Sequence, residues 1–140
     1  MDFVTFPSFR PDRSCVQLAD FLGKVPDNNW IWSVFNFYGH FNKEGPMLSG
    51  VSYEEFEALT HSEPIGYIME WFELKKFANS INQTYDCLAV AAQELQDISG
   101  DGLDKNSYSS CEVVIEAFDS TEWSVWARDK KLMQNLVSAF

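Results

Sequence analysis

Histidine and cysteine are the side chains in this sequence that could provide a nucleophile. His40 and His61 are the only two histidines, and the cysteines stand far apart at Cys15, Cys87 and Cys111. A Cys–His pair would activate a thiol, and such pairs meet in space rather than in sequence. An odd number of widely spaced cysteines does not form a disulfide framework, so we favour packed cysteines and two loop histidines. We therefore expect no catalytic residues and no enzyme.

The stretch from Asp97 to Asp104 comes closest to a metal site. It places oxygen-bearing side chains at the first, third and fifth positions of a Ca²⁺-binding loop and glycine at the sixth. The eighth position is Asp104, where an apolar residue belongs, and the twelfth is Tyr108, where a bidentate glutamate belongs. We interpret the stretch as a solvated acidic turn and predict no metal and no cofactor.

Acidic residues dominate the charge, with 21 Asp and Glu against 10 Lys and Arg and a net charge of −11. They gather in two regions. The partner-binding residues that we predict from these regions are Glu54, Glu55, Glu57, Glu94, Asp97, Asp101 and Asp104. An acidic surface attracts basic proteins, although any single residue among them could equally belong to an ordinary solvated surface.

The overall composition excludes several classes of protein. An apolar content of 46% and an aromatic content of 16% exclude disorder. The net negative charge repels phosphate backbones, so we expect no direct contact with nucleic acid. The sequence contains no apolar run long enough to span a membrane and no secretory signal at its start, which predicts a cytoplasmic protein.

Hydrophobic periodicity predicts where helices and strands lie. Apolar residues at helical spacing predict helices over 13–23, 52–59, 72–81 and 129–140. Aromatic, β-branched or alternating residues predict strands over 30–38, 65–71, 85–92, 111–117 and 123–127. The segment 85–92 could also be a buried helix, but its length favours a strand. Residues 1–12 are expected to form an extended arm, and 39–50 a loop.

This order of elements predicts a single α+β domain over 1–140, with a mixed or antiparallel sheet and helices packed on it. Asp119 and Ser120 are expected to form the tight turn of a hairpin between the last two strands. Ser14 is available to cap the first helix, and Asp129 the last.

The aromatic strand over 30–38 has two interpretations. Most of it is expected to be core, but Trp32, Asn36 or Tyr38 could line a ligand pocket or anchor an interface. Trp126 lies on the face of its strand opposite Trp123, among polar residues. The last helix either covers Trp126 or leaves it exposed as a contact residue, and we include it among the predicted partner-binding residues.

The closing segment from Cys111 to Asp129, followed by Leu132, Leu136 and Phe140, forms a strand–strand–helix pattern. In a small, acidic, aromatic-rich α+β chain, this pattern is similar to that of the immunity proteins of bacterial toxin systems. The resemblance implies a cytoplasmic, non-enzymatic protein that binds and neutralises a cognate toxin. It transfers no binding residues, because those proteins share no single fold or motif.

Charge and resemblance together favour an immunity or inhibitor protein whose partner is a basic toxin. Two alternatives remain open. The chain could be a small-molecule-binding or enzymatic α+β domain that uses the aromatic strand and the His40 and His61 loops. It could also be a phage-type acidic inhibitor that mimics nucleic acid.

Overall fold

The structure, a computed structural model, describes residues 2–42, 52–62, 64–98 and 107–138. The strands are β1 (Val4–Pro7), β2 (Ile31–Phe41), β3 (Tyr67–Met69), β4 (Ile81–Ala92), β5 (Val113–Phe118) and β6 (Glu122–Ala127). The helices are α1 (Leu18–Leu22), α2 (Tyr53–Ser62), α3 (Trp71–Asn79), α5 (Lys130–Ser138) and a short 3-10 helix, η1 (Leu95–Asp97).

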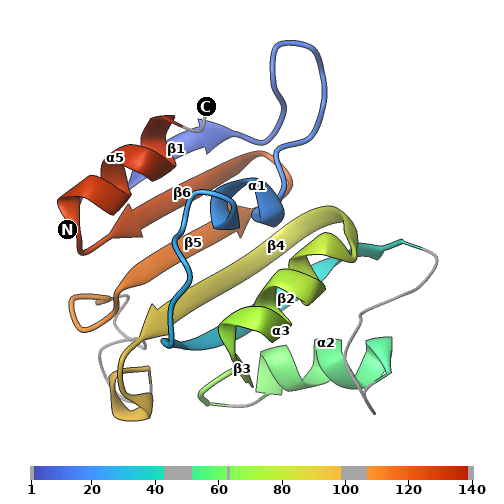
Figure 1. The fold of residues 1–140 in the computed structure, drawn as a ribbon. Helices are drawn as coiled ribbons and strands as arrows, with labels where there is room; N and C mark the ends of the chain where they lie inside the picture. The colour runs from blue at the N-terminus through green and yellow to red at the C-terminus, as the bar shows by residue number, and fades with distance from the viewer. Residues whose placement is uncertain (1, 43–51, 63, 99–106, 139–140) are drawn as a thin grey trace.

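The strands form one antiparallel sheet in the order β1-β6-β5-β4-β2-β3. Helices α1, α3 and α5 lie over one face of this sheet (Figure 1). The chain is therefore a single α+β domain with helices packed on its sheet, as the sequence predicts. None of the described helices is both long and apolar enough to cross a membrane.

Strand β4 is the central element of the core, since it pairs with β2 on one side and β5 on the other. Its side chains at Cys87, Ala89 and Ala91 face the helices and belong to the larger hydrophobic cluster. Val90 and Ala92 point the other way, into a smaller cluster. Burial on both faces explains why this segment is a continuous apolar run rather than an alternating one.

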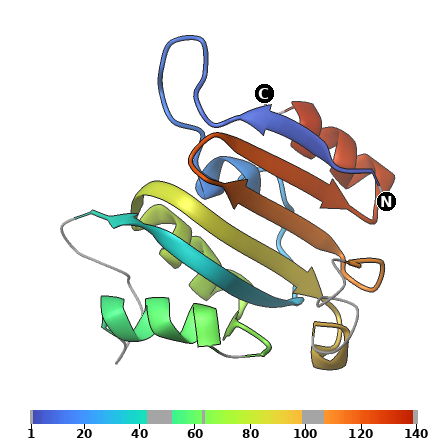
Figure 2. The same cartoon turned by 180° about the vertical axis from the view of Figure 1, so that it is seen from behind.

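The face of the sheet turned away from α1, α3 and α5 is called the open face from here on. Figure 2 looks onto it and shows β4 and β5 without a described α-helix across them. The smaller cluster covers one end of this face, where Ile98, Tyr108 and Cys111 are buried against the sheet. At the other end, beside the first half of β4, Tyr38 of β2 and Phe118 of β5 are exposed.

The hairpin of β5 and β6 forms as predicted. Its register places Ala117 opposite Trp123 and Ile115 opposite Val125. Asp119 and Ser120 have φ angles of 49° and 60° and form the tight turn, which the Thr121 amide closes by donating to the Phe118 carbonyl at 3.0 Å. Asp129 also caps α5 as predicted, since its Oδ2 accepts a hydrogen bond from the Leu132 amide at 2.9 Å.

The prediction for the N-terminus is partly wrong. Residues 4–7 are extended as predicted, but they form the edge strand β1 rather than an arm, with Phe6 opposite Trp123. The first helix begins at Leu18 rather than near Arg13, whose φ of 72° is incompatible with a helix. Ser14 therefore caps nothing in α1. Residues 8–16 instead turn back on themselves, with the Val16 amide donating to the Ser8 carbonyl at 2.7 Å.

Three further boundaries differ from the predicted ones. Strand β2 continues to Phe41, so the loop predicted over 39–50 starts later. Helix α2 runs on to Ser62 rather than ending at residue 59. Only three residues of the strand predicted over 65–71 pair as β3, because Trp71 already begins α3. The Trp71 indole is anchored there by a hydrogen bond from its Nε1 to Asp27 Oδ1 at 3.0 Å.

Candidate functional site

A β-bulge in β2 decides which aromatic side chains reach the open face. Phe35 lies opposite Leu88 and Tyr38 opposite Asp86, so three steps along β2 match two along β4. The extra residue is Asn36, at a φ of 52°, a conformation that asparagine adopts more easily than most residues. Phe37 consequently points into the core with 0% exposure, and Tyr38 turns outward with 46% exposure.

The bulge leaves backbone groups of β2 without partners in the sheet, and the last turn of α2 provides hydrogen bonds for them. The Phe37 amide donates to Thr60 Oγ1 at 3.1 Å, and His61 Nε2 donates to the Phe37 carbonyl at 3.1 Å. The His61 ring also lies 4.2 Å from the Tyr38 ring, centroid to centroid. His61 therefore belongs to a helix rather than to a loop, and His40 lies in β2, edge-on to Tyr85.

Beside this bulge, the open face is hollowed over β4. The cavity measures about 310 Å³ and is called the β4 hollow from here on. Asn36 and Tyr38 of β2 border it on one side, as the aromatic-strand interpretation allows. Other residues that line it are His61, Asp86, Leu88, Glu116 and Phe118. The third aromatic-strand candidate, Trp32, is fully buried core.

Two carboxylates meet in the β4 hollow. Asp86 is held by the hairpin turn, because the Asp119 amide donates to Asp86 Oδ1 at 2.9 Å. Glu116 is half-buried on β5, opposite Leu88. Burial raises the pKa of the Glu116 carboxyl, and the negative charge of Asp86 raises it further. At neutral pH the two carboxylates therefore repel each other, and a bound cation would relieve this repulsion.

Replacing Glu116 by glutamine is expected to raise the free energy of unfolding at pH 7, by about 1 kcal/mol or less because water screens the half-buried carboxylate. A raised pKa means that the folded state binds the proton more tightly than the unfolded state. The gain in stability should therefore reach its full size at pH values above the folded-state pKa of Glu116. It should vanish below pH 4.5, the ordinary pKa of a glutamate side chain. Urea denaturation of both proteins at several pH values measures it.

Glu112 is the matched control for this experiment. It stands four residues earlier, and its Oε1 lies 3.4 Å from Arg128 Nε and accepts a hydrogen bond from Gln93 at 3.1 Å. Glu112→Gln removes an ion pair, so it should lower stability slightly at pH 7. A Glu116→Gln variant that is also less stable than the parent at pH 7 would contradict the repulsion between Asp86 and Glu116.

Of the acidic residues predicted from the sequence, those that the structure describes do not line the β4 hollow. Glu94 is exposed just before η1, and Asp97 is half-buried at the end of η1. Asp101 and Asp104 lie outside the described residues, as does most of the stretch compared with a Ca²⁺ loop.

The other predicted acidic group belongs to α2. Glu54 and Glu55 are exposed in its first turn, whereas Glu57 is half-buried beside Tyr53. Burial and then Glu57 raise the pKa of Tyr53 to about 12. Helix α2 and η1 lie at different corners of the molecule in both views (Figures 1 and 2), so the fold does not bring Glu54 and Glu55 close to Glu94 and Asp97.

Trp126 lies on the face of β6 opposite Trp123, as predicted. The last helix does not cover it, because Leu132 and Leu136 of α5 pack in the cluster on the other face of the sheet. Trp126 is half-buried and packs instead against the smaller cluster, to which Tyr108 belongs. Whether Trp126 contacts a partner remains a prediction.

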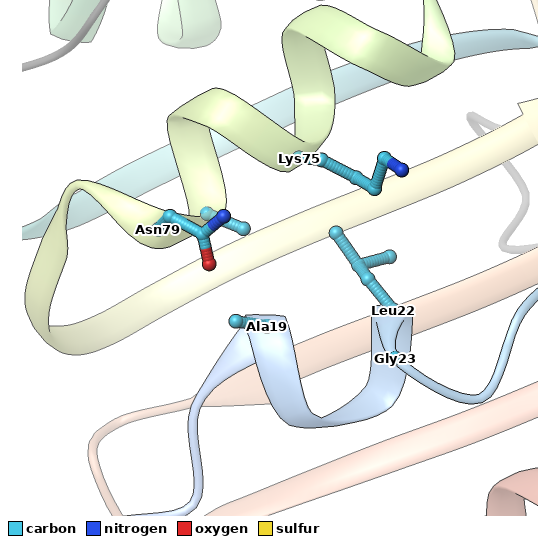
Figure 3. A pocket seen from close by; sticks show the side chains of 6 residues that line it. Ala19, Leu22, Gly23, Lys75 and Asn79 are labelled. Carbon is cyan, nitrogen blue, oxygen red and sulfur yellow. The ribbon is translucent and has the colours of Figure 1, made fainter.

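Two other hollows lie on the helix side of the molecule. Figure 3 shows the smaller, about 180 Å³, where Ala19 and Leu22 of α1 face Lys75 of α3. The Lys75 ammonium is already occupied, at 3.6 Å from Asp27 Oδ1 and 5.2 Å from the centroid of the Trp71 ring. The one charged side chain that lines this groove is therefore already paired within the protein.

The larger of these two hollows, about 420 Å³, lies between residues 23–26 and the start of α5. Its charged residues, Lys24, Lys131 and Asp129, have opposite signs. Asp129 is already engaged as the cap of α5. Of these three hollows, only the β4 hollow contains two charges of the same sign beside exposed aromatic rings.

Three residues of the β4 hollow were not singled out from the sequence: Asp86, Glu116 and Phe118. A signal for each exists. Asp86 is the one charged residue of the strand predicted over 85–92, and Glu116 and Phe118 alternate with apolar residues on β5. What the sequence lacks is the strand order, which brings β2, β4 and β5 side by side.

The described residues contain no group of three or more His, Cys, Asp or Glu side chains placed to hold a metal ion. Burial raises the pKa of the Cys87 thiol to about 12 and that of the Cys111 thiol to about 11. Both thiols therefore stay protonated and unreactive at neutral pH. No family model, curated protein or solved structure matches this chain.

Proposed function

We propose that this chain is a non-enzymatic binding protein that neutralises a basic partner protein, and that the open face around the β4 hollow is its docking surface. One observation carries the proposal. The paired carboxylates of Asp86 and Glu116 lie in a hollow beside the exposed rings of Tyr38 and Phe118, in a chain of net charge −11.

The two exposed rings suit an interface. Phe118 is 61% exposed and Tyr38 is 46% exposed. Aromatic side chains are enriched among the few interface residues that contribute most of the binding free energy. Burying such a ring against a partner contributes more to that free energy than the polar residues around it do. Tyr38 is also held in place, because its ring packs against His61, which is fixed to the Phe37 carbonyl. Such preorganisation lowers the entropy cost of binding.

The net charge suits a basic partner. An acidic protein attracts a basic one over a distance of about 10 Å at 0.1 M salt, which accelerates encounter. The exposed residues Glu54, Glu55 and Glu94 do not line the β4 hollow and would contribute to this attraction at a distance. The resemblance to immunity proteins supports a cytoplasmic role and a bacterial toxin as the partner class, with inhibition by covering of the toxin's active site.

The test uses the protein encoded by the gene adjacent to that of this chain, because an immunity gene is expected beside its toxin gene. Expressed alone, that protein should arrest growth, and co-expression of this chain should restore it. In solution, the association rate should fall about ten-fold or more between low and high salt, whereas the dissociation rate should change little. An acidic neighbour, or association that ignores salt, would contradict the proposal.

A further inference from the structure

On the premise of this proposed function, we infer that the β4 hollow is the receptor for one arginine side chain of the basic partner, its guanidinium lying between Tyr38 and Phe118 and above the carboxylates of Asp86 and Glu116.

The strand register sets the geometry of this receptor. Asp86 lies opposite Tyr38 on one side. On the other side, Cys87 lies opposite Ala117, so Phe118 is the neighbour of Asp86 on β5. Neighbouring strands stand about 4.8 Å apart, which separates the backbones under the two rings by about 10 Å. One flat group fits between the rings, with a carboxylate beneath it.

The second carboxylate extends the site along the strands. Glu116 lies opposite Leu88, the next residue of β4 on the same face as Asp86. The two acids are therefore diagonal neighbours across β4 and β5, and both line the β4 hollow. Two carboxylates at such an offset match the several N–H groups of a guanidinium fork, which can bond both acids at once.

This combination favours arginine over lysine. A guanidinium is planar, is weakly hydrated and stacks on aromatic rings, so it gains from Tyr38 and Phe118 as well as from the carboxylates. An ammonium is a compact, strongly hydrated charge, and it would satisfy one carboxylate but gain little from two facing rings. The raised pKa of Glu116 agrees with a site that lacks its cation when the partner is absent.

The size of the hollow limits the occupant. A volume of about 310 Å³ lies at the lower end of the range for small-molecule sites, which runs from about 300 to about 1,000 Å³. A single side chain fits this volume better than a large cofactor does. The open side of the hollow faces outward beside the two exposed rings, so an arginine that projects from a protein surface can enter it.

The experiment titrates the whole chain with N-acetyl-arginine methylamide while backbone amide signals are followed by NMR. The matched probes are the corresponding amides of citrulline, which has the same shape without the charge, and of lysine. We expect saturable shifts at the amides of Tyr38, Asp86 and Phe118, with a Kd of about 1–10 mM for the arginine probe. Lysine should bind at least about three-fold more weakly, and citrulline should not saturate.

The paired variant Asp86→Asn/Glu116→Gln keeps the shape of the hollow and should abolish the arginine shifts. Glu54→Gln/Glu94→Gln removes the same number of charges outside the hollow and should preserve them. Citrulline or lysine binding as tightly as arginine would overturn the inference. Shifts in the first turn of α2, at Glu54 and Glu55, and at residues 94–97 that are as strong as those at the hollow would also overturn it.

The inference and the proposed function fail in distinguishable ways. If the partner docks on the open face but the arginine probe does not bind the hollow, the arginine receptor is wrong and the docking surface stands. If the arginine probe binds as expected but the partner covers another face, the receptor chemistry stands and the proposed function is wrong.

Discussion

Glu116→Lys is expected to weaken binding of the basic partner by about 100-fold or more. Removing one member of a buried, hydrogen-bonded charge pair at an interface costs about 2–5 kcal/mol, and each 1.4 kcal/mol is about ten-fold in affinity. Reversal of the charge also adds repulsion, because the new lysine ammonium would lie in the β4 hollow where the partner's cation is proposed to bind. Calorimetric titration of the parent and variant with the partner measures the loss.

Two control variants separate this local effect from the change in net charge. Glu54→Lys and Glu94→Lys each change the charge by the same amount at exposed positions outside the β4 hollow. Each should slow association a few-fold and leave dissociation unchanged. Equal losses in all three variants would show that only the overall charge matters. The melting temperature of Glu116→Lys should stay close to that of the parent, since Asp86 can pair with the new lysine.

Phe37→Ala is expected to lower the free energy of unfolding by about 3–5 kcal/mol, the usual cost of deleting a buried phenylalanine ring. Phe37 is fully buried, and its ring packs against Phe41, Phe56 and Phe77 with centroids 5.2–5.7 Å apart. The variant leaves a cavity between β2, α2 and α3 that the surrounding rings cannot fill. Urea denaturation followed by tryptophan fluorescence measures the change.

The adjacent residue provides the control. Tyr38→Ala should cost about 1 kcal/mol or less, because the side chain is half-exposed and loses chiefly its contact with His61. It should nevertheless weaken partner binding by about ten-fold or more, as the loss of an interface anchor does. If Tyr38→Ala destabilised the protein as much as Phe37→Ala, the bulge at Asn36 would be placed wrongly.

The elements that local patterns specify were predicted well. The hairpin of β5 and β6 follows from apolar residues at every second position on both strands and from the Asp–Ser pair between them, which is typical of a turn. Helix α3 follows from Leu74, Phe77 and Ala78, which recur at helical spacing and are all buried. In each case the neighbouring residues in sequence carry the whole signal.

Elements that depend on distant partners were not predicted. Strand β1 has only four residues and two prolines nearby, and it forms because β6, more than a hundred residues away, offers it a free edge. The bulge at Asn36 is equally non-local. Its cost is compensated by Thr60 of α2, which the sequence does not place next to Phe37. Tertiary pairing therefore overrode the local preference in both segments.

The candidate site shows the same division. Tyr38 and Asn36 were named as possible pocket residues because aromatic and amide side chains on a strand are typical of binding sites. Asp86 and Glu116 were not named, because each is an isolated acid in its own segment. Only the pairing of β4 with β5 makes them neighbours, and only the pairing of β4 with β2 places them beside Tyr38. The residues predicted from clusters in the sequence, such as Glu54 and Glu94, are exposed, and their role in partner binding remains a prediction.

The most direct test of the docking surface is oxidative footprinting of aromatic side chains, with and without the bound partner. The open face carries the exposed rings of Tyr38 and Phe118, and the control is Phe72 on α3, which at 62% is as exposed as Phe118. If the open face docks the partner, oxidation of Tyr38 and Phe118 should fall several-fold in the complex while oxidation of Phe72 stays unchanged. Protection of Phe72 with Tyr38 and Phe118 still oxidised at the free rate would contradict the account.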